Sequence, residues 1–129
     1  MPSQPRSICT RSAIAAAAVA IGLAACSRAP GNAPISGADP ERGRLLVRQF
    51  GCGACHLIPG VPLAHGNVGP SLERVARQVY LAGVLPNSPD NLVRWIRFPQ
   101  QISPPSAMPQ LNISEAQARD IAAYLLTLE

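Results

Sequence analysis

The sequence contains no lysine and few aromatic, histidine, methionine or cysteine residues, which limits the chemistry that it can support. All 11 basic residues are arginine, and they form no run that would indicate binding to nucleic acid. No apolar stretch reaches the about 20 residues that a helix needs to cross a bilayer. No segment alternates strictly between apolar and polar residues, so the pattern predicts no amphipathic β-strand.

The longest apolar stretch, Ala13–Ala25, follows two arginines and no acidic residue, which is the order of a signal peptide. It ends in Leu23-Ala24-Ala25-Cys26, which resembles the lipobox of bacterial lipoproteins. In that family the cysteine is lipidated and becomes the first residue of the mature chain. An ordinary cleaved signal is the alternative. We therefore expect residues 1–25 to be a signal peptide, and residues 26–38 to be a lipidated cysteine followed by a flexible tether.

The most informative motif is Cys52-Gly53-Ala54-Cys55-His56. Two cysteines three residues apart with a histidine directly after them are the pattern for covalent attachment of a c-type haem. Each thiol then forms a thioether with the haem, and His56 becomes an axial ligand of the iron. A redox dithiol needs no adjacent histidine, and a zinc site would have only His65 to add. Cys9 lies in the expected signal peptide, so no pair remains for a structural disulfide.

A second axial ligand is predicted at Met108, because haem iron of this kind takes a methionine thioether or a second histidine. Met108 is the only methionine outside the expected signal peptide, and it lies between Pro105 and Pro109 in a proline-rich loop. A buried gap-filling role is the alternative for this side chain. His65 is the rival ligand, but it lies in a loop close to His56, and we expect it to be solvent-exposed or bonded to the backbone.

Helix signals recur along the rest of the chain. Asp39 precedes a proline, Ser88 precedes another, and Ser114 with Gln117 forms a capping box. Apolar residues at helical spacing follow each of these starts. Segments rich in proline and glycine separate them and are predicted loops, at 57–69 and 100–109. The predicted helices run from about Pro40 to Gly51, from Ser71 to Val79, from Pro89 to Phe98 and from Glu115 to the C-terminus.

Residues 39–128 resemble class I cytochromes c, and most closely the cytochrome domains attached to or accompanying subunit II of haem-copper oxidases. The matching stretches are Cys52–His56, Val68–Leu72, Leu85–Ile96, Ala107–Pro109 and Ser114–Leu128. The resemblance implies an all-α class I cytochrome c fold over residues 39–129, with about four short helices wrapped around one covalent haem c.

The same resemblance implies further packing and site residues. The first and last helices are expected to cross at Gly43, with Val47, Ile121 and Tyr124 at the crossing. The Pro70 carbonyl is expected to accept a hydrogen bond from His56. Two more assignments leave alternatives open. Trp95 lies near the haem or is a simple core aromatic, and Arg77 pairs with a haem propionate or is a solvated surface residue.

An iron with both axial positions filled by protein has no open position for a substrate, so the predicted function is one-electron transfer and not catalysis. We expect a lipid-anchored carrier on the periplasmic side of a bacterial membrane, delivering electrons to a haem-copper oxidase of a respiratory chain. A cytochrome subunit of a periplasmic dehydrogenase is one alternative. Another is a haem protein that reacts with a gas or peroxide because Met108 is labile. The expected partners are redox proteins and the membrane.

Overall fold

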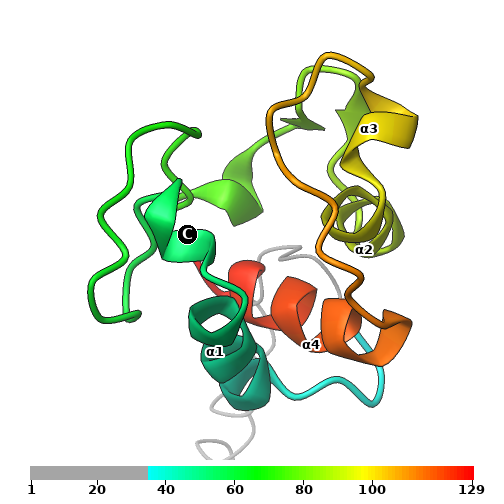
Figure 1. The fold of residues 1–129 in the computed structure, drawn as a ribbon. Helices are drawn as coiled ribbons and strands as arrows, with labels where there is room; N and C mark the ends of the chain where they lie inside the picture. Colours follow the sequence, from blue (N-terminus) through cyan, green and yellow to red (C-terminus); the bar gives the residue numbers. More distant parts are fainter. Residues whose placement is uncertain (1–34) are drawn as a thin grey trace, which may run out of the picture.

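The computed structural model describes residues 35–129, which form a mostly helical domain (Figure 1). Within that range, no helix has both the length and the apolar character needed to span a membrane. The elements are α1 (Pro40–Gln49), the 3-10 turns η1 (Cys52–Ala54) and η2 (Val75–Arg77), strands β1 (Tyr80–Leu81) and β2 (Leu85–Pro86), α2 (Pro89–Arg97), α3 (Pro99–Ile102) and α4 (Glu115–Leu125).

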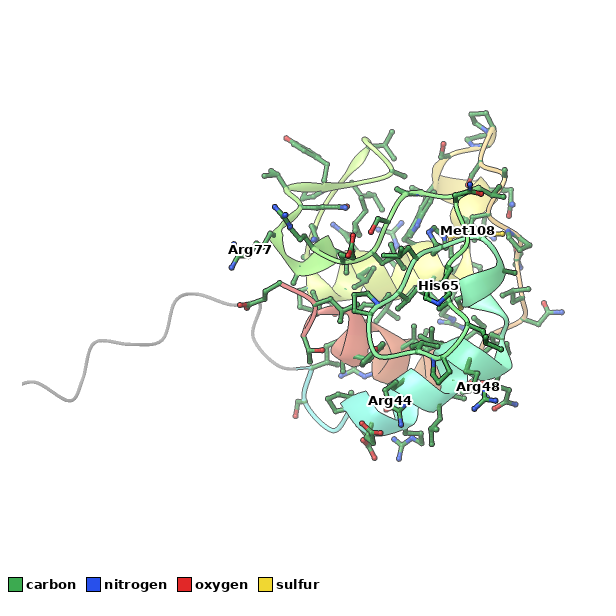
Figure 2. The ribbon with its side chains drawn as sticks, turned by 90° about the vertical axis from the view of Figure 1, so that its left-hand side faces the viewer. Arg44, Arg48, His65, Arg77 and Met108 are labelled. Carbon is green, nitrogen blue, oxygen red and sulfur yellow. The ribbon has the colours of Figure 1, made fainter. Side chains whose placement is uncertain are left out.

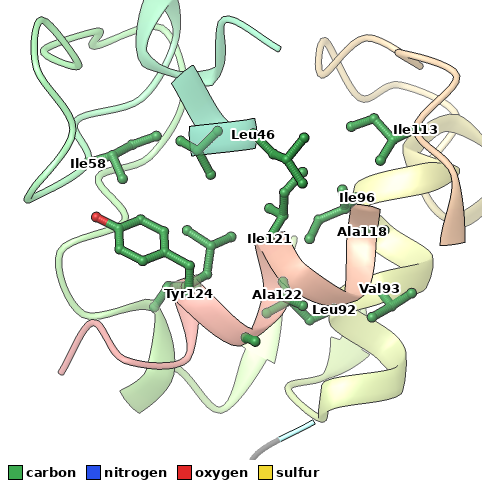
Figure 3. Packing of buried hydrophobic residues seen from close by; sticks show 14 of the residues in the cluster. Leu46, Ile58, Leu92, Val93, Ile96, Ile113, Ala118, Ile121, Ala122 and Tyr124 are labelled. Atoms are coloured by element: carbon green, nitrogen blue, oxygen red, sulfur yellow. The ribbon is translucent and has the colours of Figure 1, made fainter. Parts of the chain in front are cut away.

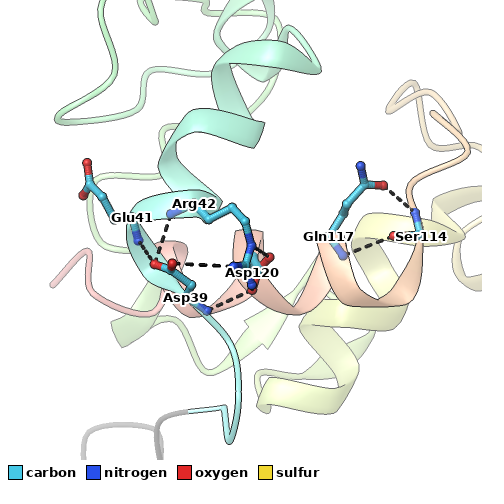
Figure 4. Close-up of polar contacts among 6 residues, drawn as sticks. All are labelled: Asp39, Glu41, Arg42, Ser114, Gln117 and Asp120. Carbon is cyan, nitrogen blue, oxygen red and sulfur yellow. Dashed lines mark hydrogen bonds and ion pairs between the residues drawn. The ribbon is translucent and has the colours of Figure 1, made fainter.

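Side-chain caps determine where the three longer helices begin. The Asp39 carboxylate accepts hydrogen bonds from the first turn of α1, with Pro40 as the first helical residue. Ser88 caps α2 in the same way. Ser114 and Gln117 bond reciprocally at the start of α4 (Figure 4). The three helix starts predicted from the sequence are therefore confirmed, because each cap satisfies backbone N–H groups that the helix itself leaves unpaired.

Helices α1 and α4 cross at very short range, as expected. A Cβ atom added to Gly43 would lie 2.0 Å from the carbonyl oxygen of Asp120, so only glycine permits this approach. Val47 and Ile121 are almost completely buried at the crossing, and Tyr124 packs beside them. Figure 3 shows that Ile121 and Tyr124 on α4 share one core with residues of α2. This crossing joins the beginning and the end of the domain.

A buried carboxylate reinforces the crossing. Asp120 is 3 % exposed, and its carboxylate accepts hydrogen bonds from the Asp39 backbone N–H (2.9 Å) and the Arg42 Nε (2.5 Å) (Figure 4). The hydrogen bond from Arg42 lowers the pKa of the Asp120 carboxyl, while burial acts in the opposite direction. Because its hydrogen bonds and its ion pair favour the ionised form, Asp120 is a buried charge with adequate partners.

Three short elements differ from the prediction. The helix expected over Ser71–Val79 shrinks to the single turn η2, because the Asn87 side chain donates to the backbone carbonyls of Val75 and Gln78. The predicted loop 100–109 begins inside a helix, since Pro99 opens the four-residue α3 instead of only ending α2. The small β1–β2 hairpin was not predicted at all. Such short elements depend on neighbouring chain segments and leave little periodic signal.

The flexible tether was predicted to extend to residue 38, but the packed domain begins earlier. Ile35 is buried in the core, and the Arg119 guanidinium donates to the Ser36 carbonyl oxygen at 3.0 Å. The Ala38 N–H donates to the Ile35 carbonyl and closes a turn. Residues 35–38 therefore belong to the fold. The expected signal peptide, Cys26 and the rest of the expected tether lie outside the described residues.

Candidate functional site

The two motif cysteines lie on η1, directly after α1. Gly51 has a φ of +70°, a conformation that favours glycine, and it turns the chain from α1 into η1. Cys52 and Cys55 are free thiols and half-buried. The Cys52 carbonyl accepts hydrogen bonds from the N–H groups of Cys55 (3.2 Å) and His56 (3.0 Å), so the motif is one compact turn. Burial raises the pKa of the Cys52 thiol.

Small residues allow the following loop to lie directly on this turn. The Gly66 N–H donates to the Gly53 carbonyl at 3.0 Å. A Cβ on Gly66 would lie 2.5 Å from the Ala54 carbonyl oxygen, and one on Gly53 would lie 2.7 Å from the Cβ of Ala64. Glycine at positions 53 and 66 is therefore required by the close contact between the loop and the turn.

The His56 ring is held on two sides. Its Nδ1 lies 2.7 Å from the Pro70 carbonyl oxygen, and because a carbonyl only accepts, Nδ1 carries the proton. A Cβ on Gly69 would lie 2.4 Å from Cε1 of the ring, so the imidazole rests against bare backbone. The Gly69 N–H in turn donates to the Cys55 carbonyl at 2.8 Å. This arrangement leaves Nε2 as the nitrogen with a free lone pair for a metal.

Met108 comes from a different part of the chain. The segment 103–113 lies on the α2 and α3 side of the molecule, and the segment containing η1 lies on the other (Figure 1). The Met108 N–H donates to the Ser106 hydroxyl at 3.2 Å, and the Gln100 amide donates to the Met108 carbonyl. Met108 is partly buried, so α3 and its loop fix the backbone that carries the only thioether of the described residues.

The remaining predicted site residues differ in their surroundings. Trp95 is partly buried in α2 and packs against the hydrophobic core. Arg77 lies in η2 and is exposed, and its role toward a haem propionate stays a prediction. His65 is exposed on the loop after the motif, and its backbone N–H donates to the Leu63 carbonyl at 3.1 Å, in agreement with the sequence analysis (Figure 2).

The residues present fit a haem. Partly buried apolar side chains pack against the core and provide apolar surface, which a macrocycle of this kind needs. The donors are two thiols, one imidazole with a fixed orientation and one thioether, a set that suits covalent attachment and two axial bonds. No three side chains of His, Cys, Asp or Glu in residues 35–129 converge on a possible metal site. Leu72, Leu85, Trp95 and Leu111 are among these partly buried side chains.

Two supporting residues were not singled out from the sequence. Gly69 lies under the His56 ring, and Gln100 holds the Met108 carbonyl. The Gly69-Pro70 pair was a detectable turn signal. Nothing local to Gln100 distinguishes it from Gln101, because its partner is separated from it by a whole loop.

Comparisons with known proteins show which family the sequence matches. A family model described as cytochrome c matches residues 40–129. Over 90 residues the chain is 32 % identical to cytochrome c oxidase subunit 2 of Alkalihalophilus pseudofirmus, which covers 69 % of this chain and 25 % of that protein. The chain thus spans about a quarter of the length of that relative. Cytochrome c2 of Rhodobacter sphaeroides matches with a TM-score of 0.46 and 20 % identity, over 70 % of this chain and 96 % of that chain.

Proposed function

This chain belongs to the cytochrome c family, and we propose that it is a membrane-tethered, single-haem carrier that delivers electrons to a haem-copper oxidase. The family match and the mostly helical structure establish a class I cytochrome c fold. Membership of the family also means that the chain binds haem c covalently and transfers electrons. The axial ligands, the tether and the identity of the partner are our proposal.

The hydrogen bond that orients the His56 ring is the observation that best supports the proposed iron site. Nδ1 is occupied by the Pro70 carbonyl at 2.7 Å, so Nε2 is the nitrogen available as a ligand. Cys52 and Cys55 on the adjoining turn would attach the haem, and Met108 would fill the opposite axial position. The bound haem supplies an iron that changes oxidation state by one electron. The chain's own part is to fill both axial positions and to surround the group with apolar side chains, which favours electron transfer over substrate binding.

An oxidase partner is supported by the match to cytochrome c oxidase subunit 2. The matched part of that relative belongs to a cytochrome c oxidase subunit, so a domain of this kind occurs there in one chain with an oxidase component. The Leu23-Ala24-Ala25-Cys26 sequence supports a lipid anchor on a separate chain. A tether would keep the carrier near membrane proteins and raise its effective concentration there.

Oxygen uptake by washed membranes of the source bacterium tests this proposal. With ascorbate as the electron donor, the haem-loaded full chain is expected to restore cyanide-sensitive uptake. A Cys26→Ala variant should stay in the soluble fraction or remain an uncleaved precursor. At equal low concentration its soluble form should support slower uptake, and at saturating concentration it should reach the same rate. Absence of cyanide-sensitive uptake with the wild type would contradict the oxidase partner, and a Cys26→Ala variant that still carries lipid would contradict the anchor.

A further inference from the structure

Leu63 is an exposed apolar residue on a strained backbone. Its side chain is 86 % exposed, more than any other large apolar side chain in the described part of the chain. Its φ is +63°, a left-handed conformation that costs a residue with a Cβ on the order of 1 kcal/mol. Ala82 and Asn112 share this conformation, but one is small and the other is a type that tolerates it. Leucine at position 63 therefore contributes little to folding, and its side chain faces solvent.

This side chain borders a hollow that lies beside the haem-attachment turn η1. The hollow has a volume of about 190 Å³, and Gly53 and Ala54 of η1 line it. Pro62 and Leu63 line it from the loop after the motif, and Arg48 lines it from α1. Sites for small organic ligands have volumes of roughly 300–1,000 Å³, so this hollow fits one side chain better than a ligand molecule.

Arg48 supplies a positive charge at the rim. It is the only charged residue that lines the hollow, and within residues 35–129 its guanidinium has no hydrogen-bond or ion-pair partner. Arg44, one turn earlier on α1, is by contrast bonded to the Glu41 carboxylate at 2.6 Å and to the Gly60 carbonyl at 3.3 Å. Figure 2 shows both arginines on α1 beside the loop that carries His65. Leu45, also on the α1 surface, is 56 % exposed.

We propose that Leu63, Arg48 and the hollow between them form a docking site for the redox partner protein. The partner is expected to present an apolar side chain that enters the hollow, next to a carboxylate that pairs with Arg48. Residues between the two haem-attaching cysteines line the hollow, so a protein docked there lies against the segment that holds the haem. This inference rests on the proposed electron-transfer function for the existence of a partner, but it does not depend on the partner being an oxidase.

A Leu63→Gly variant separates docking from folding. Glycine adopts a φ of +63° without strain, and little buried surface is lost, so the variant should keep or gain stability in urea unfolding. Its saturable electron-exchange rate with washed membranes should fall about fivefold or more, because a central apolar contact is removed. Ala82→Gly is the matched control. It relieves the same kind of strain at an exposed position and should leave the exchange rate unchanged.

A charge reversal tests the second half of the site. Arg48→Glu should lower the exchange rate roughly tenfold at low ionic strength, and the difference should shrink as salt screens the pair. Arg94→Glu makes the same change at an exposed position of α2 and serves as the control for net charge. The visible spectrum after complete reduction by ascorbate should be the same in all four variants and the wild type, which checks that the haem itself is unaltered.

Two assays with washed membranes distinguish a failure of the docking site from a failure of the proposed oxidase function. Cyanide-sensitive oxidation reports an oxidase, and substrate-driven reduction of the cytochrome reports a dehydrogenase. A slower reaction of Leu63→Gly in either assay supports the docking site, even if no cyanide-sensitive oxidation is observed. An unchanged rate in the assay that shows electron exchange overturns the docking site, as does the absence of saturable exchange in both assays. Salt-sensitive binding of the wild type to phosphatidylglycerol vesicles that is lost in Leu63→Gly would assign this face to lipid and also overturn it.

Discussion

Gly69 and Pro70 show how two neighbouring residues orient one imidazole. The Pro70 carbonyl selects the protonated Nδ1, and the missing side chain of Gly69 leaves room for the ring. Partners of this kind, which contact a ligand and not the metal, commonly change metal affinity by about 10–100-fold. The Pro70 contact was predicted from the family resemblance alone, whereas the role of Gly69 is visible only in the folded structure.

Gly69→Ala should disturb the iron site without unfolding the domain. The new methyl group would lie 2.4 Å from Cε1 of His56 and would push the ring off the Pro70 carbonyl. We expect roughly 10–100-fold weaker axial ligation, seen as a larger high-spin fraction in the visible spectrum. Gly83→Ala is the control, because it adds a methyl group in open space at a φ of +72°. If it altered the spectrum as much, the contact with His56 would not be the cause.

Asp120→Asn should make stability less sensitive to acid. The folded-state pKa of Asp120 is lowered below its ordinary value of 3.8, first by the hydrogen bond from Arg42. A lowered pKa means that the carboxylate stabilises the fold at neutral pH, and that this contribution is lost as the pH falls through the folded-state pKa. Urea unfolding should show a deficit of about 1–3 kcal/mol for the variant at pH 7. The two proteins should converge in strong acid, and an equal deficit at both pH values would refute this role.

At the scale of elements, the α1–α4 crossing is the main packing contact. It depends on the bare Gly43 backbone on one side and on Val47 with Ile121 in the interior. Because helices that approach this closely leave no space for a methyl group, the stability of the domain should be sensitive to this glycine.

Gly43→Ala should destabilise the domain by about 1–3 kcal/mol or more, since the added Cβ would lie 2.0 Å from the Asp120 carbonyl oxygen. Helix propensity alone would give the opposite sign, because alanine favours helix over glycine. Leu45→Ala, at an exposed position of the same helix, is the control and should change stability little. The measurement is the midpoint of urea unfolding, and a stabilised Gly43→Ala variant would show that the crossing is looser than described.

The longer helices could be predicted because each carries its own boundary signals. Asp39, Ser88 and Ser114 are local caps, and the apolar periodicity behind them needs no tertiary information. The β1–β2 hairpin and α3 have no side-chain cap of this kind. The hydrogen bonds from Asn87, which follows β2, to the carbonyls of Val75 and Gln78 join separate segments, and a periodicity argument does not capture such contacts.

At the scale of the whole molecule, the proposed iron ligands come from two separate parts of the chain. The attachment turn and its loop lie on one side, and the Met108 segment with α2 and α3 lies on the other (Figure 1). Residues 35–38, the first part of the described range, belong to the same body, since Ile35 is buried in the core. The sequence predicted the attachment residues from a five-residue pattern. It did not predict that the packed domain includes Ile35, because one isoleucine among proline, glycine and serine carries no periodic signal.

The most direct test of the proposed iron site compares the wild type with Met108→Ala. It measures carbon monoxide binding and the reduction potential of both proteins. Loss of the Met108 thioether opens the sixth position, so the variant should bind carbon monoxide rapidly. Its potential should be lower, because the sulfur that favours ferrous iron is gone. The covalent haem and helical content should persist, since Cys52, Cys55 and His56 are unchanged. A wild type that already binds carbon monoxide as fast as the variant, at an equal potential, would contradict His56 and Met108 as the two axial ligands of an electron carrier.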